Sequence, residues 1–266
     1  MIWPHATIKN PCPICGKTDW CSFGDKAMLC QRIASEHAHP KGGWFHFYET
    51  AKPISVPPPR KFVPPSTINF GNLSDRFRNE AKLIDLAIQL GVSIGSLESL
   101  HAGWSNQYRA WTFPMRDASG KIIGMQLRGE QKRSITGSRL GLFIPQIDPQ
   151  PVVYLPEGAS DTAAFLSMGL YAIGRPSCNA GNEMVAEFLK LNSIFKAVVV
   201  ADRDEIKAGG NRPGSQGALK LKMQLKVSSV FWIPPNKIKD VREFYRLGGT
   251  KEIIESQVKN KVWSKI

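Results

Sequence analysis

Two short stretches decide the fold expected of this chain: Leu155-Pro-Glu-Gly-Ala-Ser-Asp161 and Val198-Val-Val-Ala-Asp-Arg-Asp204. Each begins with an apolar run typical of a buried strand and ends in carboxylates. Because the carboxyl ends of parallel strands meet at one edge of a sheet, Glu157, Asp202 and Asp204 should lie close together. Carboxylate oxygens bind hard cations such as Mg²⁺, so the sequence predicts a site for metal and phosphate.

Strand and helix patterns alternate around these stretches, from about residue 150 onward. Strands are expected at 152–155, 171–173, 196–201 and 227–233, and helices at 160–168, 183–191 and 216–225, with helical pieces from Asp240 and from Lys251. This alternation predicts an α/β fold, a mainly parallel sheet with helices on both faces.

Residues 67–148 indicate a small mixed α+β subdomain. Apolar residues recur at helical spacing over 79–100 and are interrupted at Gly91, which predicts two short helices. Two β-rich runs at 110–115 and 121–128 flank a turn and predict a hairpin. The basic residues here form either a phosphate-binding face or a merely solvated one; they are Arg109, Arg116, Lys121, Arg128, Lys132, Arg133 and Arg139.

Six prolines occur among the fifteen residues of 52–66, which predicts an extended, semi-rigid linker. The linker divides a small N-terminal module, residues 1–51, from the rest of the chain. The expected domains are therefore the module at 1–51, the linker at 52–66, the basic subdomain at 67–148 and the α/β domain at 149–266.

Four of the five cysteines fall within the first 30 residues, and this crowding favours a metal over disulfides. Cys12-Pro-Ile-Cys15-Gly is a tight turn that presents two thiolates to one ion, and Cys21 and Cys30 follow at spacings that suit a zinc ribbon. We expect these four sulfurs to hold a structural Zn²⁺. One of three histidines could instead replace Cys21: His37, His39 or His46.

Aromatic and basic residues are interleaved in the same module. This composition suits single-stranded nucleic acid, whose bases stack on rings while its phosphates pair with cations. The alternative is that some of the rings pack around the zinc. The residues concerned are Trp20, Phe23, Trp44, Phe45, Phe47 and Tyr48, with Lys17, Lys26, Arg32 and Lys41.

The chain is strongly basic, with 35 Lys and Arg against 22 Asp and Glu and a formal net charge of +13. Such an excess suits a polyanion, with nucleic acid as the leading candidate and a merely soluble basic surface as the alternative. The sequence contains no apolar run of about eighteen residues and no signal-peptide pattern. We expect a cytoplasmic protein with no membrane partner.

The pattern Glu-Gly-x-x-Asp after one strand and Asp-x-Asp after a later one resembles the Toprim domain of bacterial DnaG-type primases, topoisomerases and some nucleases. Residues 113–128, Phe-Pro-Met-Arg-Asp-Ala-Ser-Gly-Lys-Ile-Ile-Gly-Met-Gln-Leu-Arg, resemble a hairpin of the primase polymerase core, and 132–143 resemble its next basic stretch. The cysteine module and the linker also precede the rest of the chain in the order expected of a primase with an N-terminal zinc-binding domain. The resemblance covers roughly residues 10–248 and favours the DnaG-type primases, in particular those of phages or mobile elements.

The resemblance implies roles for five carboxylates. Glu157 would act as a general base or would organise the metal and the 3′-hydroxyl. Asp202 and Asp204 would hold Mg²⁺ or Mn²⁺, and Asp161 and Asp240 would complete the cluster. Among the basic residues, Arg128 and Lys132 or Arg133 would contact nucleotide phosphates or the template.

The activity implied is the synthesis of short RNA primers on single-stranded DNA from nucleoside triphosphates, by two-metal nucleotidyl transfer. A length of 266 residues leaves no room for a helicase domain or a topoisomerase gate, so a replicative helicase would act in trans. Two alternatives stay open. A Toprim nuclease would use the same acids to activate water, and a zinc-dependent DNA-binding protein would keep the fold without catalysis.

The chain departs from the family pattern at two places. Arg203 stands where the family's Asp-Gly-Asp has glycine, which would put a cation beside the metals. Residues 205–215 are an insertion rich in glycine, and the Ala-Gly pair that starts the next helix is displaced to Gly217-Ala218. These departures affect the expected geometry of the nucleotide pocket.

Overall fold

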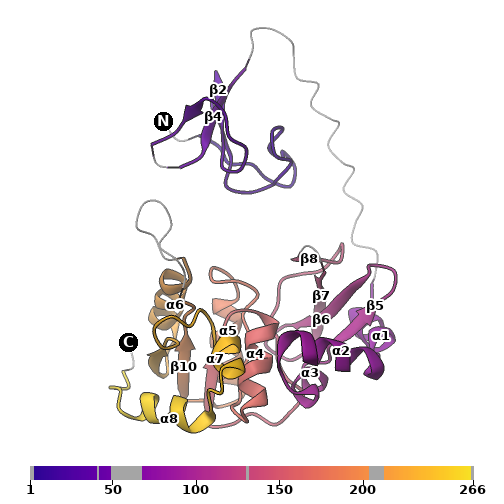
Figure 1. Ribbon diagram of the computed structural model, residues 1–266, viewed down its shortest axis with the longest axis vertical. Coiled ribbons are helices and arrows are strands. Elements are labelled where there is room, and N and C mark those ends of the chain that lie inside the picture. The colour runs from indigo at the N-terminus through magenta and orange to yellow at the C-terminus, as the bar shows by residue number, and fades with distance from the viewer. Residues whose placement is uncertain (1–2, 41, 49–67, 130–131, 204–212, 265–266) are drawn as a thin grey trace. The chain divides into compact units, whose positions relative to one another are not determined.

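The computed structural model describes residues 3–40, 42–48, 68–129, 132–203 and 213–264. The described residues form two compact units, an N-terminal one and a larger one that begins after the proline-rich stretch (Figure 1). The expected linker at 52–66 lies outside the described residues. Each unit is therefore considered by itself.

The N-terminal unit is a small antiparallel sheet with the strand order β1-β2-β4-β3. Its strands are β1 (Ser22–Phe23), β2 (Ala27–Cys30), β3 (His37–Ala38) and β4 (Trp44–Phe47). The buried core contains three cysteines together with Ala6 and Met28, and Phe23 and Tyr48 pack against it. So few apolar side chains give little burial energy, and a bound metal would supply what the core lacks.

The larger unit opens with three helices, α1 (Phe70–Phe77), α2 (Glu80–Leu90) and α3 (Ile94–Ser99). The two later helices confirm the prediction over 79–100. The Asn79 side chain accepts a hydrogen bond from the Lys82 backbone at the start of α2, and Gly91 ends it with φ of 67°. Helix α1 was not predicted, because it is short and contains a glycine and several polar residues.

An antiparallel sheet with the order β5-β6-β7-β8 follows these helices. Its strands are β5 (Gly103–Ser105), β6 (Ala110–Arg116), β7 (Ile122–Arg128) and β8 (Lys132–Ser134). Strands β6 and β7 confirm the predicted hairpin. The Asp117 side chain accepts hydrogen bonds from the backbone of Ser119 and Lys121, which fixes the turn between them.

A parallel sheet with the order β11-β10-β9 forms the second half of this unit. Its strands are β9 (Val152–Leu155), β10 (Lys196–Val200) and β11 (Ser228–Trp232). The strand expected at 171–173 is reduced to isolated bridges, in which Ala172 pairs with Tyr154 and Arg175 pairs with Glu157. The helices are α4 (Gly158–Ser167), α5 (Asn182–Leu191), α6 (Pro213–Gln224), α7 (Val241–Arg246) and α8 (Lys251–Lys259).

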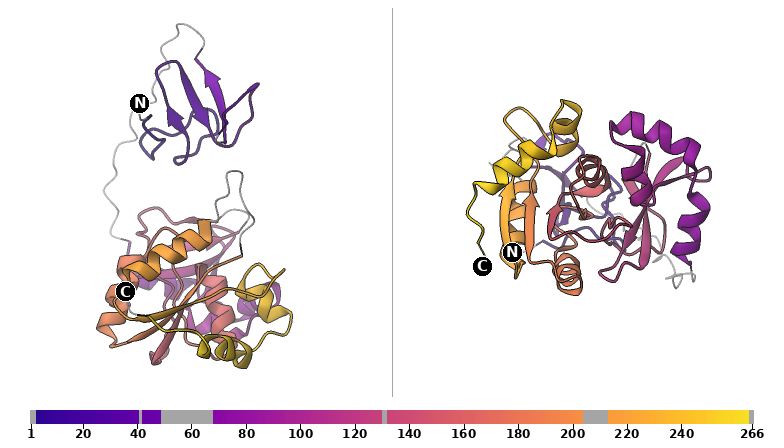
Figure 2. Two further views of the ribbon diagram at one scale, coloured as in Figure 1. Left: turned by 90° about the vertical axis from the view of Figure 1, so that its left-hand side faces the viewer. Right: turned by 90° about the horizontal axis from the view of Figure 1, so that it is seen from below.

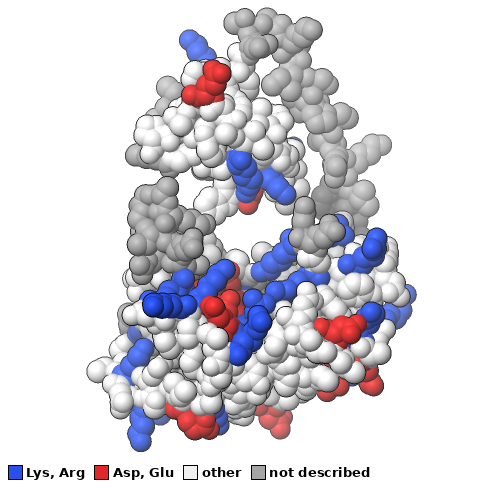
Figure 3. Space-filling model, in the orientation of Figure 1, with Lys and Arg blue, Asp and Glu red and all other residues white. Residues whose placement is uncertain are grey.

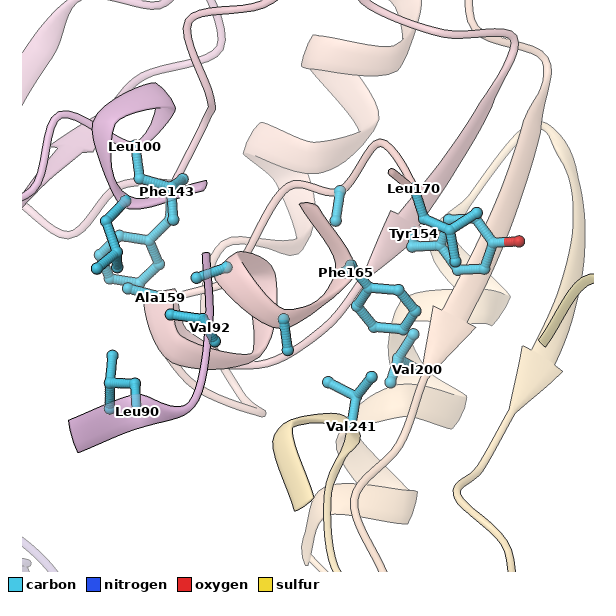
Figure 4. Packing of buried hydrophobic residues seen from close by; sticks show 14 of the residues in the cluster. Leu90, Val92, Leu100, Phe143, Tyr154, Ala159, Phe165, Leu170, Val200 and Val241 are labelled. Atoms are coloured by element: carbon cyan, nitrogen blue, oxygen red, sulfur yellow. The ribbon is translucent and has the colours of Figure 1, made fainter. Parts of the chain in front are cut away.

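Helices cover both faces of the parallel sheet, as the alternation predicted. Successive residues of β10 point to opposite faces, so Val198 and Val200 join a core with α4, α7 and α8, whereas Ala197 and Val199 join one with α5 and α6. On the first face, the rings of Phe165 and Tyr154 stack with their centroids 4.9 Å apart (Figure 4). The Phe165 ring also packs edge-on against Trp232, with the centroids 5.9 Å apart. The α/β fold class is confirmed.

Isolated bridges connect the two sheets of the larger unit. Gly174 pairs with Phe143, and Leu142 pairs with Arg116 at the end of β6. Figures 1 and 2 show the result, with α1 and α2 beside β5–β8 and with α6 and α8 beside the parallel sheet. None of the described helices is both long and apolar enough to span a membrane.

Candidate functional site

The sulfurs of Cys12, Cys15, Cys21 and Cys30 all lie within 4.8 Å of one another. The Sγ atoms of Cys15 and Cys21 are 3.7 Å apart. Tetrahedral zinc with Zn–S bonds of about 2.3 Å requires sulfurs about 3.8 Å apart, so the cysteine geometry fits this ion. The expectation of a four-cysteine zinc site is supported by this cluster.

Backbone amides surround these sulfurs. The Gln31 and Ile33 amides donate to Cys21 and Cys30 at 3.5 and 3.4 Å. Burial alone would raise the pKa of Cys15, but hydrogen bonds from the Lys17 backbone and from the other sulfurs lower it to about 7. Burial raises the pKa of Cys21 to about 12. A zinc ion would displace such protons, because the thiolate is the ligand.

The three histidines proposed as alternative ligands have other contacts. His46 Nε2 lies 3.0 Å from the Ile33 carbonyl oxygen. The His37 ring packs edge-on against Phe47 at 5.0 Å, and the His39 ring packs against Phe45 at 5.1 Å. The aromatic residues divide as the sequence allowed: Phe23 and Tyr48 pack on the cysteine core, whereas Trp20 and Phe47 are each 60% exposed.

The second site is a pocket of about 380 Å³ at the carboxyl edge of the parallel sheet. Three of the five predicted carboxylates line it together with two of the predicted basic residues: Glu157, Asp161, Asp202, Arg128 and Lys132. Figure 3 shows acidic atoms on this face of the larger unit with Lys and Arg on both sides of them. The pocket therefore combines metal-binding oxygens with phosphate-binding cations.

Local structure explains how the carboxylates reach this edge. Glu157 follows β9, and Gly158 then turns the chain into α4 with φ of 80°, a value that favours glycine. Asp161 lies in the first turn of α4, and Asp202 follows the end of β10. Parallel pairing of β9 and β10 brings these segments to the same edge.

Asp161 lies in a strongly negative and buried environment. It is 7% exposed. Burial raises its pKa well above the ordinary value, and the charges of Asp202 and Asp240 raise it further, whereas Arg242 and Arg128 lower it. Burial of an ionised carboxylate is costly unless cations compensate for it, so the pocket favours a positively charged ligand.

Asp240 does not line the pocket, although its charge acts on Asp161, and it caps a helix. Its Oδ1 accepts a hydrogen bond from the Glu243 amide at 2.8 Å, which begins α7. Its Oδ2 lies 4.0 Å from Nη2 of Arg242. Asp204, the fifth predicted carboxylate, lies outside the described residues.

Two arginines near the carboxylates were missed by the sequence reasoning. Arg175 is 1% exposed, and its Nη1 donates to the Cys178 carbonyl at 3.1 Å. Burial lowers its pKa, whereas the nearby charge of Glu157 raises it. The charge of Arg242 lowers the pKa of Asp161. A signal for Arg175 was present, because it follows the expected strand at 171–173 and so lies at the same sheet edge.

The predicted basic face is only partly brought to the pocket. Arg116 is 7% exposed, and its Nη1 donates to the Gly120 carbonyl at 2.8 Å, so it braces the hairpin turn instead of facing solvent. Arg133 lies 6.0 Å from the Tyr108 ring centroid. The remaining members are exposed and do not line the pocket: Arg109, Lys121 and Arg139.

Arg203 does not face the carboxylates through its guanidinium group. Its Nε and Nη2 both donate to the Pro234 carbonyl, at 3.2 and 2.7 Å. Its backbone amide donates to the Lys239 carbonyl at 2.7 Å. The residue that departs from the family pattern therefore ties the end of β10 to the loop that leads to Asp240.

The pocket fits an open site for a hard cation. Among the described residues, only the four cysteines bring three or more ligand atoms within 4.8 Å of one another, so the carboxylates do not form a closed cage. Mg²⁺ is usually held by one or two carboxylates, with waters and substrate phosphates as the other ligands. Glu157 and Asp202 suit that arrangement, and Asp161 lines the same pocket.

No protein-family model matches the sequence, and no curated protein sequence matches it either. Solved structures do match the fold, at low sequence identity. The Escherichia coli primase catalytic core is 15% identical, with a TM-score of 0.53 over 72% of this chain and 79% of that one.

Two further structures give similar values. A DnaG primase catalytic domain bound to single-stranded DNA is 13% identical, with a TM-score of 0.53 over 73% of this chain and 77% of that one. The Aquifex aeolicus primase, with its zinc-binding and RNA polymerase domains, is 16% identical, with a TM-score of 0.53 over 74% of this chain and 60% of that one. The chain therefore has a DnaG-type primase fold.

Proposed function

We propose that this protein is a DNA primase that joins ribonucleotides on a single-stranded DNA template. The observation that carries the proposal is the pocket where Glu157, Asp161 and Asp202 meet Arg128 and Lys132, in a chain with the fold of DnaG catalytic cores. Phosphoryl transfer requires a divalent cation, anionic ligands to hold it and cations to bind the triphosphate. The pocket offers the carboxylates that would hold the cation and the basic side chains that would bind the triphosphate.

In this proposal the carboxylates have different tasks. Mg²⁺ or Mn²⁺ supplies charge neutralisation of the triphosphate and lowers the pKa of the attacking hydroxyl. Asp202 holds the cation, with Asp204 as a partner from outside the described residues. Glu157 orients the 3′-hydroxyl and accepts its proton. Asp161 and Asp240 are further acidic groups near the cation, and the positive charges of Arg175 and Arg242 partly neutralise the cluster of carboxylates.

The basic residues bind the anionic reactants. Arg128 and Lys132 line the pocket and contact the phosphates of the nucleoside triphosphate. The exposed residues Arg109, Lys121 and Arg139 attract the template backbone. The cysteine module holds Zn²⁺ and uses its exposed rings, Trp20 and Phe47, to stack on template bases. A Toprim-type catalytic domain, a cytoplasmic location and a helicase acting in trans belong to the same proposal.

A primer-synthesis assay tests the proposal. The protein is incubated with single-stranded DNA, labelled nucleoside triphosphates and Mg²⁺ or Mn²⁺, and the products are separated on a denaturing gel. We expect short labelled oligomers from the wild type and from the control Asp148→Asn, whose side chain is exposed and does not line the pocket. Asp202→Asn should abolish them, because it removes a charged metal ligand at nearly constant size.

The same assay distinguishes the alternatives. Template shortening without new oligomers, lost in Asp202→Asn, would replace the primase with a metal-dependent nuclease. DNA binding with neither product would leave a non-catalytic zinc-dependent DNA-binding protein. Circular dichroism of each variant shows whether a lost activity reflects lost folding.

A further inference from the structure

A second pocket lies at the opposite edge of the parallel sheet from the carboxylates. It has a volume of about 420 Å³ and is lined by the first residues of two strands, Val152 of β9 and Lys196 of β10, together with side chains of α8 and Trp263. This volume falls within the range of small-molecule sites, about 300–1,000 Å³. All of its lining residues belong to the larger unit.

The pocket is remote from the carboxylates. Val152 and Glu157 are five positions apart in extended chain, which spans roughly 16 Å at about 3.3 Å per residue. The two lining sets share no residue. One small ligand therefore cannot occupy both pockets, and this second pocket has no part in the proposed nucleotidyl transfer.

The side chain of Tyr154 lines this pocket. Tyr154 is 3% exposed, and its ring stacks on Phe165 at 4.9 Å, which fixes the side chain. Its hydroxyl points away from the other labelled core residues (Figure 4) and has no hydrogen bond to another described residue. Burial raises its pKa to about 12, so the hydroxyl stays neutral and can donate to a ligand.

The walls combine positive charge with aromatic surface. Three lysines line the pocket, Lys196, Lys251 and Lys259, against one carboxylate, Glu255, whose Oε1 lies 3.7 Å from Lys251 Nζ. The ammonium of Lys196 lies 5.8 Å from the Trp263 ring centroid. The remaining walls include the apolar side chains Leu170 and Val258. A bare anion would satisfy the lysines but would leave these apolar walls unfilled.

We propose that this pocket binds a nucleoside phosphate at a second, non-catalytic site. The base fits between apolar and aromatic walls, with Trp263 as its stacking surface and the Tyr154 hydroxyl as a hydrogen-bond partner for a polar edge. Its phosphates lie among the ammonium groups of Lys196, Lys251 and Lys259. The ligand is either a free nucleotide or the phosphorylated end of a strand, since both present this chemistry.

Fluorescence titration with N-methylanthraniloyl-ATP tests the proposal, without added divalent metal so that the negatively charged carboxylate pocket does not retain the triphosphate. The double variant Lys196→Glu/Lys259→Glu reverses two exposed charges of the pocket and should weaken binding roughly tenfold or more. Lys220→Glu is the matched control, because it reverses an exposed lysine on α6 that lines neither pocket.

Three further arms make the result specific. Trp263→Ala should weaken binding and Trp263→Phe should restore most of it, because a ring is sufficient for stacking. Asp202→Asn should bind as the wild type does, so loss of nucleotidyl transfer and loss of this site are separate results. Competition by AMP or by a 5′-phosphorylated oligonucleotide supports the site and identifies which source fits better.

Several outcomes would overturn the proposal. Equal weakening by Lys220→Glu would show attraction by general positive charge. Loss of binding in Asp202→Asn would assign the signal to the carboxylate pocket. Competition by inorganic phosphate as effective as that by AMP would show a simple anion site, and absence of saturable binding would show no site.

Discussion

Replacing Arg203 with alanine should loosen the loop after β11 while leaving the parallel sheet intact. Two hydrogen bonds from the guanidinium to the Pro234 carbonyl would be lost, at 3.2 and 2.7 Å. The backbone bond from residue 203 to the Lys239 carbonyl would survive, because it does not depend on the side chain. The effect should therefore be local to residues 233–240.

The expected magnitude follows from the bonds that are lost. A hydrogen bond from a charged donor contributes about 1.5–3 kcal/mol, and here two donors share one acceptor on a partly exposed side chain. We expect a loss of about 2 kcal/mol in the local free energy of opening. That corresponds to a roughly 30-fold larger open population of the loop.

Hydrogen–deuterium exchange measured by mass spectrometry follows this opening in peptides that cover residues 233–247. Arg203→Lys keeps the charge but offers one donor atom, so its exchange should fall between those of the wild type and Arg203→Ala. Lys190→Ala serves as the control, because it removes an exposed cation from α5. Unchanged exchange at 233–240 in Arg203→Ala, or an increase spread evenly over the larger unit, would refute the bracing role.

Two further predictions concern the metal module and Asp161. Cys21→Ser should lose the bound zinc, measured by metal analysis, and should lose exchange protection in residues 3–48 but not in the larger unit; protection that persists without zinc would contradict this. The pKa of Asp161 is raised in the folded protein. The protonated side chain is therefore accommodated below about pH 4, and the folded state loses stability as the pH rises through the folded pKa and the buried side chain must ionise. Denaturant unfolding should therefore find Asp161→Asn more stable than the wild type at pH 8 but not at pH 4, with Asp148→Asn as the control; equal stabilities at pH 8 would contradict the cost of burying this charge.

Much of the secondary structure could be predicted because its signals are local. Gly91 ends a helix through its own backbone preference, and Asn79 begins one by capping it. The hairpin follows from two β-rich runs around the Asp117 turn. The prediction of a strand over 171–173 was wrong, because strand pairing depends on neighbouring segments. In the structure this segment forms only isolated bridges.

The contacts of the basic residues could not be predicted from local sequence patterns. Arg116 and Arg128 are the last residues of neighbouring strands of one hairpin, Arg116 beside the turn and Arg128 at the other end. The fold turns Arg116 toward the Gly120 carbonyl and brings Arg128 to the carboxylates. Arg203 was expected beside the metals, yet its guanidinium binds Pro234, 31 residues further along the chain.

By itself, the sequence determined which chemical groups are available and which end of each strand carries them. Apolar runs that end in Glu157 and Asp202 specify a shared sheet edge, and four crowded cysteines specify a cluster that could hold a metal ion, because both patterns act over short distances. Only the tertiary structure decided which cations meet those carboxylates. Arg175 and Arg242 reach them, and Tyr154 opens onto a second pocket, through packing between elements that are distant in the chain. Such contacts depend on the geometry of the whole core, which no local pattern encodes.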